Sequence, residues 1–378
     1  MRKNSLFALA TLIGTIVGAG IFGVPYAISK SGIIPGLFYF FILGGVVLLI
    51  HLFFGEIIFR TKEKHRLIGY TQKYLGDRGK IFITISTIVG LVGALLVYTI
   101  IGGDFLKIVF SPWINLPSFC FSLFFLLVLS YFIFRGIKII APVELLTNLL
   151  FFLIVFIVFC FGLSKVNFQN FTLVNPENLF LPYGIILFAL GGWTAIPEIS
   201  EILKNSEDRR SFKKIIVLTT IIAILIYLLF AFTVLGVSGQ NTSTEALQGL
   251  VPFLGQKIIF FGALAAVITL ADSFLIIGLS LRNTLIYDYK IPKIFAASLS
   301  CGLPLILFLI GFRNFIETIG FLGTLIGVIE GIIIILIFKK AKEFSDREPE
   351  YSLEVPSFLI YFLMLIFILG AISQIFLV

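Results

Sequence analysis

The chain has 378 residues, of which 59% are hydrophobic and 13% are charged, with a formal net charge of +8 and a mean hydropathy of +1.12. Ordinary soluble domains are about 45–50% apolar and about 25% charged. So few charges cannot cover a water-facing surface, so the composition argues against a soluble enzyme. Uncharged apolar runs such as 178–197 and 215–244 are long enough for a bilayer-spanning helix, which takes roughly 20 residues. We therefore expect a polytopic helical membrane protein, and such continuous runs do not fit a membrane β-barrel.

Hydropathy along the chain predicts an all-α protein with eleven transmembrane helices in one membrane domain, residues 1–378. The predicted spans are 5–30, 36–59, 81–106, 117–134, 139–162, 178–203, 214–236, 257–287, 294–311, 315–338 and 356–376. The loop over 60–80 is long enough for a short helix ending near Gly76.

The distribution of basic residues predicts the orientation. With the N-terminus in the cytoplasm, all but five of the 28 Lys and Arg residues fall on the cytoplasmic side; the exceptions are Lys30, Lys107, Lys165, Lys257 and Arg313. The positive-inside rule then predicts an integral protein of the cell membrane with a cytoplasmic N-terminus and an external C-terminus.

The first span has some features of a secretory signal peptide, because Arg2 and Lys3 precede an apolar stretch that contains small residues at 17–20. Its apolar run continues past these small residues to Ile28, so we expect the segment to be retained as a span.

Matching interruptions occur in the first and sixth predicted spans. Superimposing Gly20 on Gly192 places Pro25 on Pro197, an offset of 172 residues. The second segment lies five spans further along the chain, so the second copy enters the membrane from the opposite side. An inverted repeat with matching Gly/Pro interruptions is typical of a transporter with a binding site at mid-membrane. We expect repeats over 5–162 and 178–338, followed by an additional helix over 356–376.

The interruptions predict exposed peptide groups. Inside hydrocarbon a helix can be broken only where it lines a cavity, because every N–H and C=O needs a partner. Unwinding near Gly18–Gly20 would start a half-helix near Ile21, whose free amides favour a carboxylate. Freed carbonyls around Val17 and Ala189–Leu190 suit an ammonium or a small cation, so a zwitterionic amino acid fits both. The alternative interpretation is that these glycines only pack helices together.

The segments GTIVGAGIFGVPYAISKSG and ALGGWTAIPEI resemble the first and sixth helices of the amino acid permeases in the amino acid–polyamine–organocation superfamily. The similarity is greatest to the amino acid/auxin permease and aromatic amino acid permease branches, and it covers essentially the whole chain. It implies the LeuT-type fold, with two inverted five-helix repeats plus one extra helix, and secondary amino acid transport driven by H+ or Na+. The substrate-binding residues that it implies are Thr15, Gly18, Ala19, Gly20, Ala189, Gly191, Gly192 and Trp193, and the expected start of the half-helix adds Ile21. Trp193 stands where relatives often carry a smaller aromatic residue, so side-chain selectivity stays open.

Asp272, deep in the eighth span, is the acid to which we give most weight. The resemblance implies an ion-coupling site formed by Gly14, Val17, Thr269, Asp272 and Ser273. A protonatable carboxyl would serve proton coupling equally well, and the remaining alternative is a structural hydrogen bond to a neighbouring helix.

Other acids carry weaker predictions. Glu198 follows Pro197 and is a candidate for gating or proton relay, or for a structural pair with Lys204. Glu330 lies deep in the tenth span with no motif to support it, but its depth makes it worth testing. The three cysteines lie singly in apolar runs, so we expect neither a disulfide nor a metal site.

The chain lacks the HExxH, GxSxG, P-loop and CxxC motifs that mark common catalytic sites, so we expect no enzyme. We predict a secondary active transporter that carries amino acids by alternating access, with no cofactor beyond a coupling H+ or Na+ and no nucleic-acid partner. Two alternatives remain: an ion-independent exchanger or uniporter, and a substrate sensor of transporter fold.

Overall fold

The computed structural model describes residues 3–136, 141–203, 206–287 and 289–375. These ranges are largely helical and contain no strand. Nine helices are long and apolar enough to cross a membrane, and the pair Asn4–Ile16 and Gly20–Ser31, bent by 48°, adds a tenth if it is one span. The apolar helix Ser357–Ser373 is shorter than the other spans. A polytopic all-α protein is thus confirmed, with nine or ten spans over the described residues where the sequence predicted eleven.

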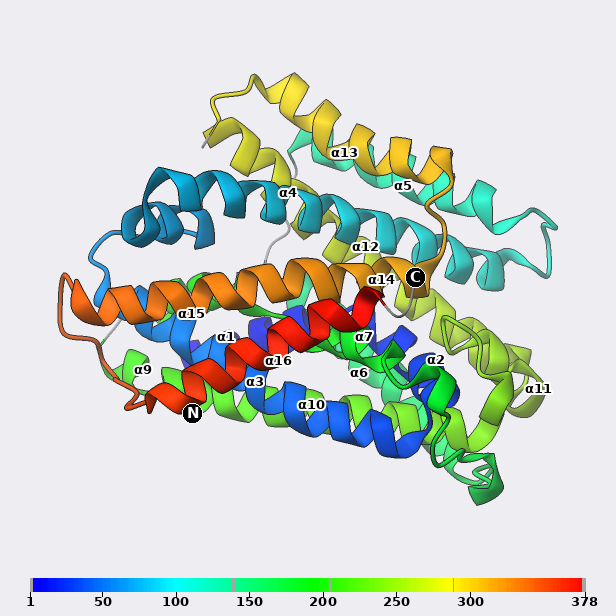
Figure 1. Ribbon diagram of the computed structural model, residues 1–378. Helices are drawn as coiled ribbons and strands as arrows, with labels where there is room; N and C mark the ends of the chain where they lie inside the picture. The colour runs from blue at the N-terminus through cyan, green and yellow to red at the C-terminus, as the bar shows by residue number, and fades with distance from the viewer. Residues whose placement is uncertain (1–2, 137–140, 204–205, 288, 376–378) are drawn as a thin grey trace.

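The helices lie side by side along one direction, with the loops at the two ends of the bundle (Figure 1). In chain order they are α1 (Lys3–Ile16), α2 (Gly20–Ser31), α3 (Ile33–Arg60), α4 (Leu67–Phe110), α5 (Ser118–Arg135), α6 (Ala141–Leu163), α7 (Leu181–Leu190), α8 (Ile196–Ile202), α9 (Ser206–Arg210), α10 (Phe212–Ser238), α11 (Val251–Leu254), α12 (Gln256–Tyr287), α13 (Lys293–Ile310), α14 (Phe315–Phe321), α15 (Val328–Glu343) and α16 (Ser357–Ile375).

The chain departs from α-helical geometry at two further places, one within α4 and one between α14 and α15. In α4, Gly76 has φ 76° and ψ −172°, a conformation that glycine adopts readily, so a short helical segment ends there as predicted. Between α14 and α15 the chain winds as a π-helix over Leu322–Gly327. Short π-helical segments occur often at functional sites, which draws attention to this one.

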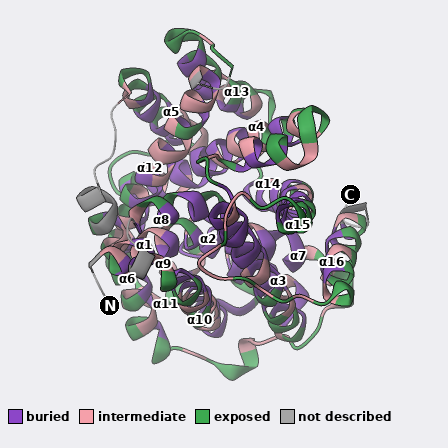
Figure 2. Ribbon diagram, turned by 90° about the vertical axis from the view of Figure 1, so that its left-hand side faces the viewer, coloured by how far each residue is buried: buried purple, intermediate pink, exposed green. Residues whose placement is uncertain are grey.

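The burial pattern is that of a membrane protein. Buried residues fill the centre of the bundle and exposed ones lie at its rim (Figure 2). Many of the rim residues are large and apolar, such as Phe41 at 82% exposure and Ile294 at 74%. Side chains of this kind on the outer surface are compatible with hydrocarbon and not with water.

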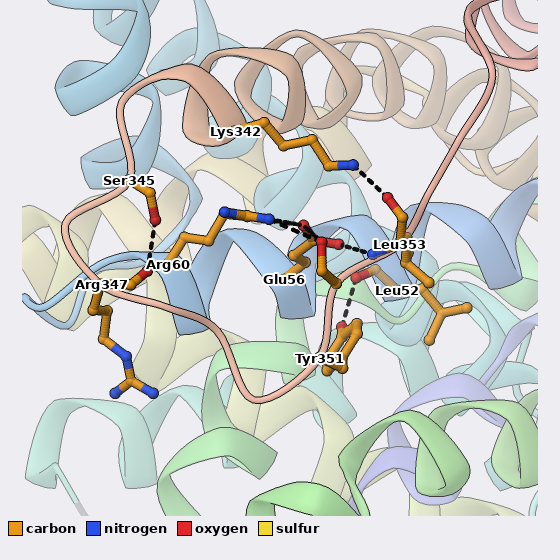
Figure 3. A network of polar contacts seen from close by, with 9 residues as sticks. Leu52, Glu56, Arg60, Lys342, Ser345, Arg347, Tyr351 and Leu353 are labelled. Carbon is orange, nitrogen blue, oxygen red and sulfur yellow. Dashed lines mark hydrogen bonds and ion pairs between the residues drawn. The ribbon is translucent and has the colours of Figure 1, made fainter.

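One end of the bundle is crossed by the segment 344–356, which joins α15 to α16 and which we call the strap (Figure 3). Glu56, fully buried in α3, accepts hydrogen bonds from Arg60 Nε at 2.8 Å and from the amide of Leu353 at 2.7 Å. The Tyr351 hydroxyl donates to the Leu52 carbonyl at 2.6 Å. These contacts fasten the strap to the last two turns of α3.

The strap end of the bundle also carries many basic side chains, and we call it the basic end. Arg209 pairs with Glu350 of the strap at 3.1 Å, and Arg66 pairs with Glu201 at 2.9 Å. The N-terminus lies here as well, because Asn4 Nδ2 donates to Asp208 at 3.0 Å, beside Arg209. From the strap, α16 runs back toward the other end (Figure 1).

Candidate substrate and ion site

The first predicted break lies between α1 and α2. Helical geometry stops at Ile16 and resumes at Gly20, and the two halves are bent by 48°. In the gap the Gly18 amide donates to the Ile16 carbonyl at 3.0 Å, and the Ile21 amide donates to the Gly18 carbonyl at 3.3 Å. These bonds span two and three residues instead of four, so the α-helical ladder is interrupted where the sequence predicted it.

The second break lies between α7 and α8. The α-helix ends at Leu190, Gly191 has ψ 134° and Gly192 has φ −167° and ψ 7°, so both leave helical geometry. A single 3-10 turn over Trp193–Ala195 then leads into α8. Both predicted interruptions are therefore present.

The two breaks face each other. The half-helix α2 packs on α7, and α1 packs on α8. A Cβ atom at Gly20 would lie 2.6 Å from the Cα atom of Ala189, and one at Gly192 would lie 2.5 Å from Cγ1 of Ile16. These glycines thus have two roles. They let the backbone leave helical geometry, as the sequence suggested, and they allow the broken spans to approach each other closely.

Tyr227 of α10 joins the two breaks. Its fully buried hydroxyl lies 2.9 Å from the Ile16 carbonyl and 2.8 Å from the Ala189 carbonyl. The hydroxyl has one proton to donate, so the two carbonyls share a single donor. Sequence analysis missed this residue; the signal was a lone tyrosine within the apolar run 215–237.

A cavity of about 180 Å³ lies between the breaks, and we call it the substrate cavity. Of the predicted substrate residues, Thr15, Gly18, Ala19, Gly20, Ala189, Gly191, Gly192 and Trp193 line it. Ile21 is fully buried and does not line it. The rest of the cavity wall is largely apolar and includes small residues, among them Gly90 and Ala94 of α4 and Gly327 of the π-helical segment.

A second cavity, also of about 180 Å³, adjoins the first and shares Thr15, Tyr98 and Trp193 with it. It extends to Arg66 and Leu67, at the start of α4, so we call it the basic-end cavity. The residues that line the two cavities thus form a path from the breaks toward the basic end.

The predicted ion-coupling residues are partly brought together. Gly14, Asp272 and Ser273 line the basic-end cavity, whereas Val17 and Thr269 are buried and line neither cavity. The Tyr98 hydroxyl contacts Ser273 and the backbone of Ala19, which connects this region to the first break.

Asp272 itself has one engaged and one available oxygen. Its Oδ2 accepts a hydrogen bond from Thr147 Oγ1 of α6 at 2.6 Å. Its Oδ1 is buried and accepts no hydrogen bond from the described residues. The contact with Thr147 fits the structural alternative, and the second oxygen is placed to bind a cation or a proton.

Two further acids lie in the cavities. Glu198 is exposed in the basic-end cavity, and Lys204, its predicted alternative partner, lies outside the described residues. Glu330 of α15 is 6% exposed and lines both cavities. Its Oε2 accepts the indole N–H of Trp193 at 2.6 Å, and its Oε1 accepts the Thr87 hydroxyl at 3.3 Å. The second break is therefore held by an acid from a distant part of the chain.

Comparison with known proteins identifies relatives over nearly the whole chain. The sequence pattern of the tryptophan/tyrosine permease family matches residues 1–374. The chain is 27% identical over 358 residues to tyrosine-specific transport system 2 of Haemophilus influenzae, covering 86% of this chain and 85% of that protein. It is also 27% identical over 278 residues to the serine/threonine exchanger SteT of Bacillus subtilis, covering 69% and 63% of the two chains.

The fold has a solved counterpart. The structure of MhsT in complex with L-phenylalanine superimposes with a TM-score of 0.67, covering 97% of this chain and 98% of that one at 14% identity. This similarity confirms the LeuT-type fold that the resemblance implied.

Proposed function

This chain belongs to the tryptophan/tyrosine permease family, and we propose that it carries aromatic amino acids across the cell membrane by alternating access. Family membership makes it an amino acid transporter and not an enzyme, as the sequence predicted. The observation that supports the proposal most is the substrate cavity between two broken spans, lined by eight of the nine predicted substrate residues.

The two ends of a zwitterion have partners at the breaks. The half-helix α2 begins at Gly20, and the first amides of a helix have no intrahelical acceptors. The Ile21 and Phe22 amides donate to the Gly18 and Ala19 carbonyls, which leaves the Gly20 amide. We assign the substrate carboxylate to the Gly20 amide, where the helix dipole is also favourable. The Ile16 and Ala189 carbonyls share the Tyr227 proton, and the Ile16 carbonyl also accepts from the Gly18 amide, so we assign the substrate ammonium to the second lone pair of the Ala189 carbonyl.

The side chain of the substrate would lie on the apolar wall. Gly90, Ala94 and Gly327 leave room beside Trp193, and a flat ring fits against such small residues. The tyrosine transporter among the relatives supports an aromatic substrate. The exchanger among the relatives supports the alternative of exchange without ion coupling.

Orientation and coupling complete the proposal. We place the basic end in the cytoplasm by the positive-inside rule, so that the N-terminus is cytoplasmic and the C-terminus external. With this orientation we propose that the structure is in an inward-facing state, because the basic-end cavity extends toward that end. We propose symport, with Asp272 as an ion-coupling position beside Gly14, Val17, Thr269 and Ser273, and with inverted repeats over 5–162 and 178–338.

The test is uptake into proteoliposomes that contain the purified protein. Counterflow of labelled L-tyrosine and L-tryptophan is expected, and imposed proton and sodium gradients, applied separately, identify the driving ion. Absence of counterflow for every amino acid would reject transport. Counterflow without accumulation under either gradient would favour the exchanger.

Pocket size can be tested at Ala94. Ala94→Leu fills the wall of the substrate cavity and is expected to reduce counterflow of tyrosine and tryptophan more than that of alanine. Equal effects on large and small amino acids would contradict the placement of the ring.

A further inference from the structure

Glu330 occupies a distinctive position in the site. It follows the π-helical segment Leu322–Gly327 by three residues and, among the described residues, is the only acid that lines both cavities. Trp193, which it holds, belongs to the second break, and Thr87 belongs to α4. One carboxyl group thus connects a broken span, a long span and the π-helical segment.

The hydrogen bonds of Glu330 are compatible with an ionised carboxylate in this conformation. Its Oε2 accepts from an indole N–H, which can only donate, and its Oε1 lies 3.3 Å from the Thr87 hydroxyl, which can donate to a carboxylate. Both donors are neutral, and no ion pair joins a cation to Glu330 within the part of the chain that the structure describes. An unpaired charge inside the membrane is costly unless water reaches it. The basic-end cavity supplies that access here.

Protonation would change these contacts. A protonated carboxyl keeps a carbonyl oxygen for Trp193 and can donate its O–H to the Thr87 hydroxyl, but the bond from the indole is then weaker, because it no longer has a charged acceptor. Closing the basic-end cavity would remove water from Glu330 and favour the neutral form. The position of the second break is thereby linked to a proton on Glu330.

We propose that Glu330 is the residue that carries the coupling proton, and that its ionised form holds Trp193 in the inward-facing state. The proton binds to a carboxylate oxygen while the site faces outward. It leaves to cavity water when the basic end opens, and the electron pair of the broken O–H bond stays on the carboxylate. The proposal rests on the transport function above and leaves the Asp272 neighbourhood as a candidate site for a metal cation.

Other ionisable groups near this region are alternative proton sites. Four of them line the basic-end cavity: Arg66 and Tyr98 of α4, Glu198 of α8 and Asp272 of α12. The ring centroid of His51 of α3 lies 6.3 Å from that of Trp193, and Glu56 of α3 binds Arg60 and the strap. Lys339 of α15 lies over the ring of Tyr361 of α16, 5.6 Å from its centroid. Arg66 is already paired with Glu201. Tyr98 also lines both cavities, but its hydroxyl contacts the first break at Ala19. Among the carboxyl groups named here, Glu330 is the one that bonds Trp193 of the second break and lines both cavities.

The test compares Glu330→Gln with wild type in proteoliposomes. The amide keeps the size of the side chain but cannot exchange a proton. Accumulation of L-tyrosine under a proton gradient is expected to fall to the equilibrium level, whereas counterflow is reduced far less. A pH indicator trapped in the vesicles should report proton entry with substrate for wild type and none for Glu330→Gln.

Two variants serve as controls. Glu245→Gln neutralises another buried carboxylate, one that accepts from the amide of Gln248 and lines neither cavity, and is expected to keep proton-driven accumulation. Asp272→Asn tests the competing assignment. If Asp272→Asn stops proton entry and Glu330→Gln does not, the inference is wrong.

A second measurement avoids any variant. A hydrophobic carbodiimide reacts with protonated carboxyl groups in apolar surroundings, and peptide mass spectrometry locates the adduct. Labelling of wild-type Glu330 is expected to decrease as the pH rises and to change when L-tyrosine is bound. Labelling that is absent or independent of pH would overturn the proton assignment even if tyrosine transport is demonstrated, whereas absence of all counterflow would overturn the transport function itself.

Discussion

At the scale of single residues, the hydroxyl of Tyr227 is the contact that fixes the two breaks relative to each other. Tyr227→Phe removes the only proton shared by the Ile16 and Ala189 carbonyls. Leaving a buried acceptor without its donor costs about 1–3 kcal/mol. We expect a loss of this size in the free energy of unfolding in detergent and a weaker affinity for L-tyrosine, measured by scintillation proximity binding.

Tyr183→Phe is the matched control. The Tyr183 hydroxyl donates to the Ile366 carbonyl at 3.3 Å, and the residue lines neither cavity. Its loss is expected to leave the affinity for L-tyrosine unchanged. An unaltered affinity in Tyr227→Phe, or an equal loss in both variants, would contradict the role of Tyr227.

Gly20 tests the close contact between the breaks. A methyl group there would lie 2.6 Å from the Cα atom of Ala189, too close for any real contact, so Gly20→Ala must push the spans apart. Overpacking of this kind costs about 1–3 kcal/mol and should reduce counterflow strongly. Gly45→Ala, in open space within α3, should leave both unfolding and counterflow nearly unchanged. Similar counterflow in the two variants would show that the breaks do not need this contact.

The sequence predicted the positions of the two breaks but not the side chains that hold them. The glycines and prolines identify the breaks because their backbone chemistry is local. Tyr227 and Thr87 come from other spans, and nothing in their own sequence surroundings indicates which carbonyl or carboxyl they reach. Glu330 was a candidate only because it lies deep in a predicted span. Its contact with Trp193 depends on how α15 packs against the second break, which the sequence does not show.

At the scale of elements, the strap is predicted to stabilise the basic end. Glu56→Gln removes the buried charge that binds Arg60 and the Leu353 amide. Removing one partner of a buried ion pair lowers the free energy of unfolding by about 3 kcal/mol. We expect a decrease of this order in the free energy of unfolding, measured by denaturant titration in detergent.

Glu343→Gln is the comparison for this variant. Its pair with Lys340 has exposed side chains, so its loss should cost less than about 1 kcal/mol. Equal effects of the two variants would mean that the strap contributes no more than a surface ion pair.

A second contact of the strap gives stability a defined dependence on pH. The hydrogen bond from Lys73, followed by that from the Lys62 amide, lowers the pKa of Asp346 below its usual range. A group whose pKa is lower in the folded state stabilises the protein above its unfolded pKa, about 3.9 for Asp, and this contribution disappears as the pH falls through the folded value.

We therefore expect Asp346→Asn to be slightly less stable than wild type at neutral pH. The difference should be constant down to about pH 5 and should vanish below the lowered pKa. Thermal unfolding of both proteins across this range checks the prediction. A difference that grows on acidification would have the wrong sign.

The elements differ in how far the sequence determined them. Span positions follow from hydropathy and agree with the helices within a few residues for most of the chain. The π-helical turn at Leu322–Gly327 was not predicted, because its glycines also fit a continuous helix. The strap was not predicted either, since a polar loop between two spans does not reveal which helix it will cross.

At the scale of the whole molecule, the LeuT-type fold was accessible from the sequence because two motifs identify it and the hydropathy pattern supports it. The conformational state was not accessible, because inward-facing and outward-facing states share every residue. The basic-end cavity extends from the breaks to Arg66 and Leu67, which the sequence did not indicate. The alternating access that we propose would move α1, α2, α7 and α8 against the remaining spans.

The most direct test of this account is an experimental structure of the protein with bound L-tyrosine or L-tryptophan. We predict ligand density in the substrate cavity, with the carboxylate at the Gly20 amide, the ammonium at the Ala189 carbonyl, and the ring against Ala94 and Gly327. Density at any other place, or uninterrupted helices through residues 14–26 and 188–198, would contradict it.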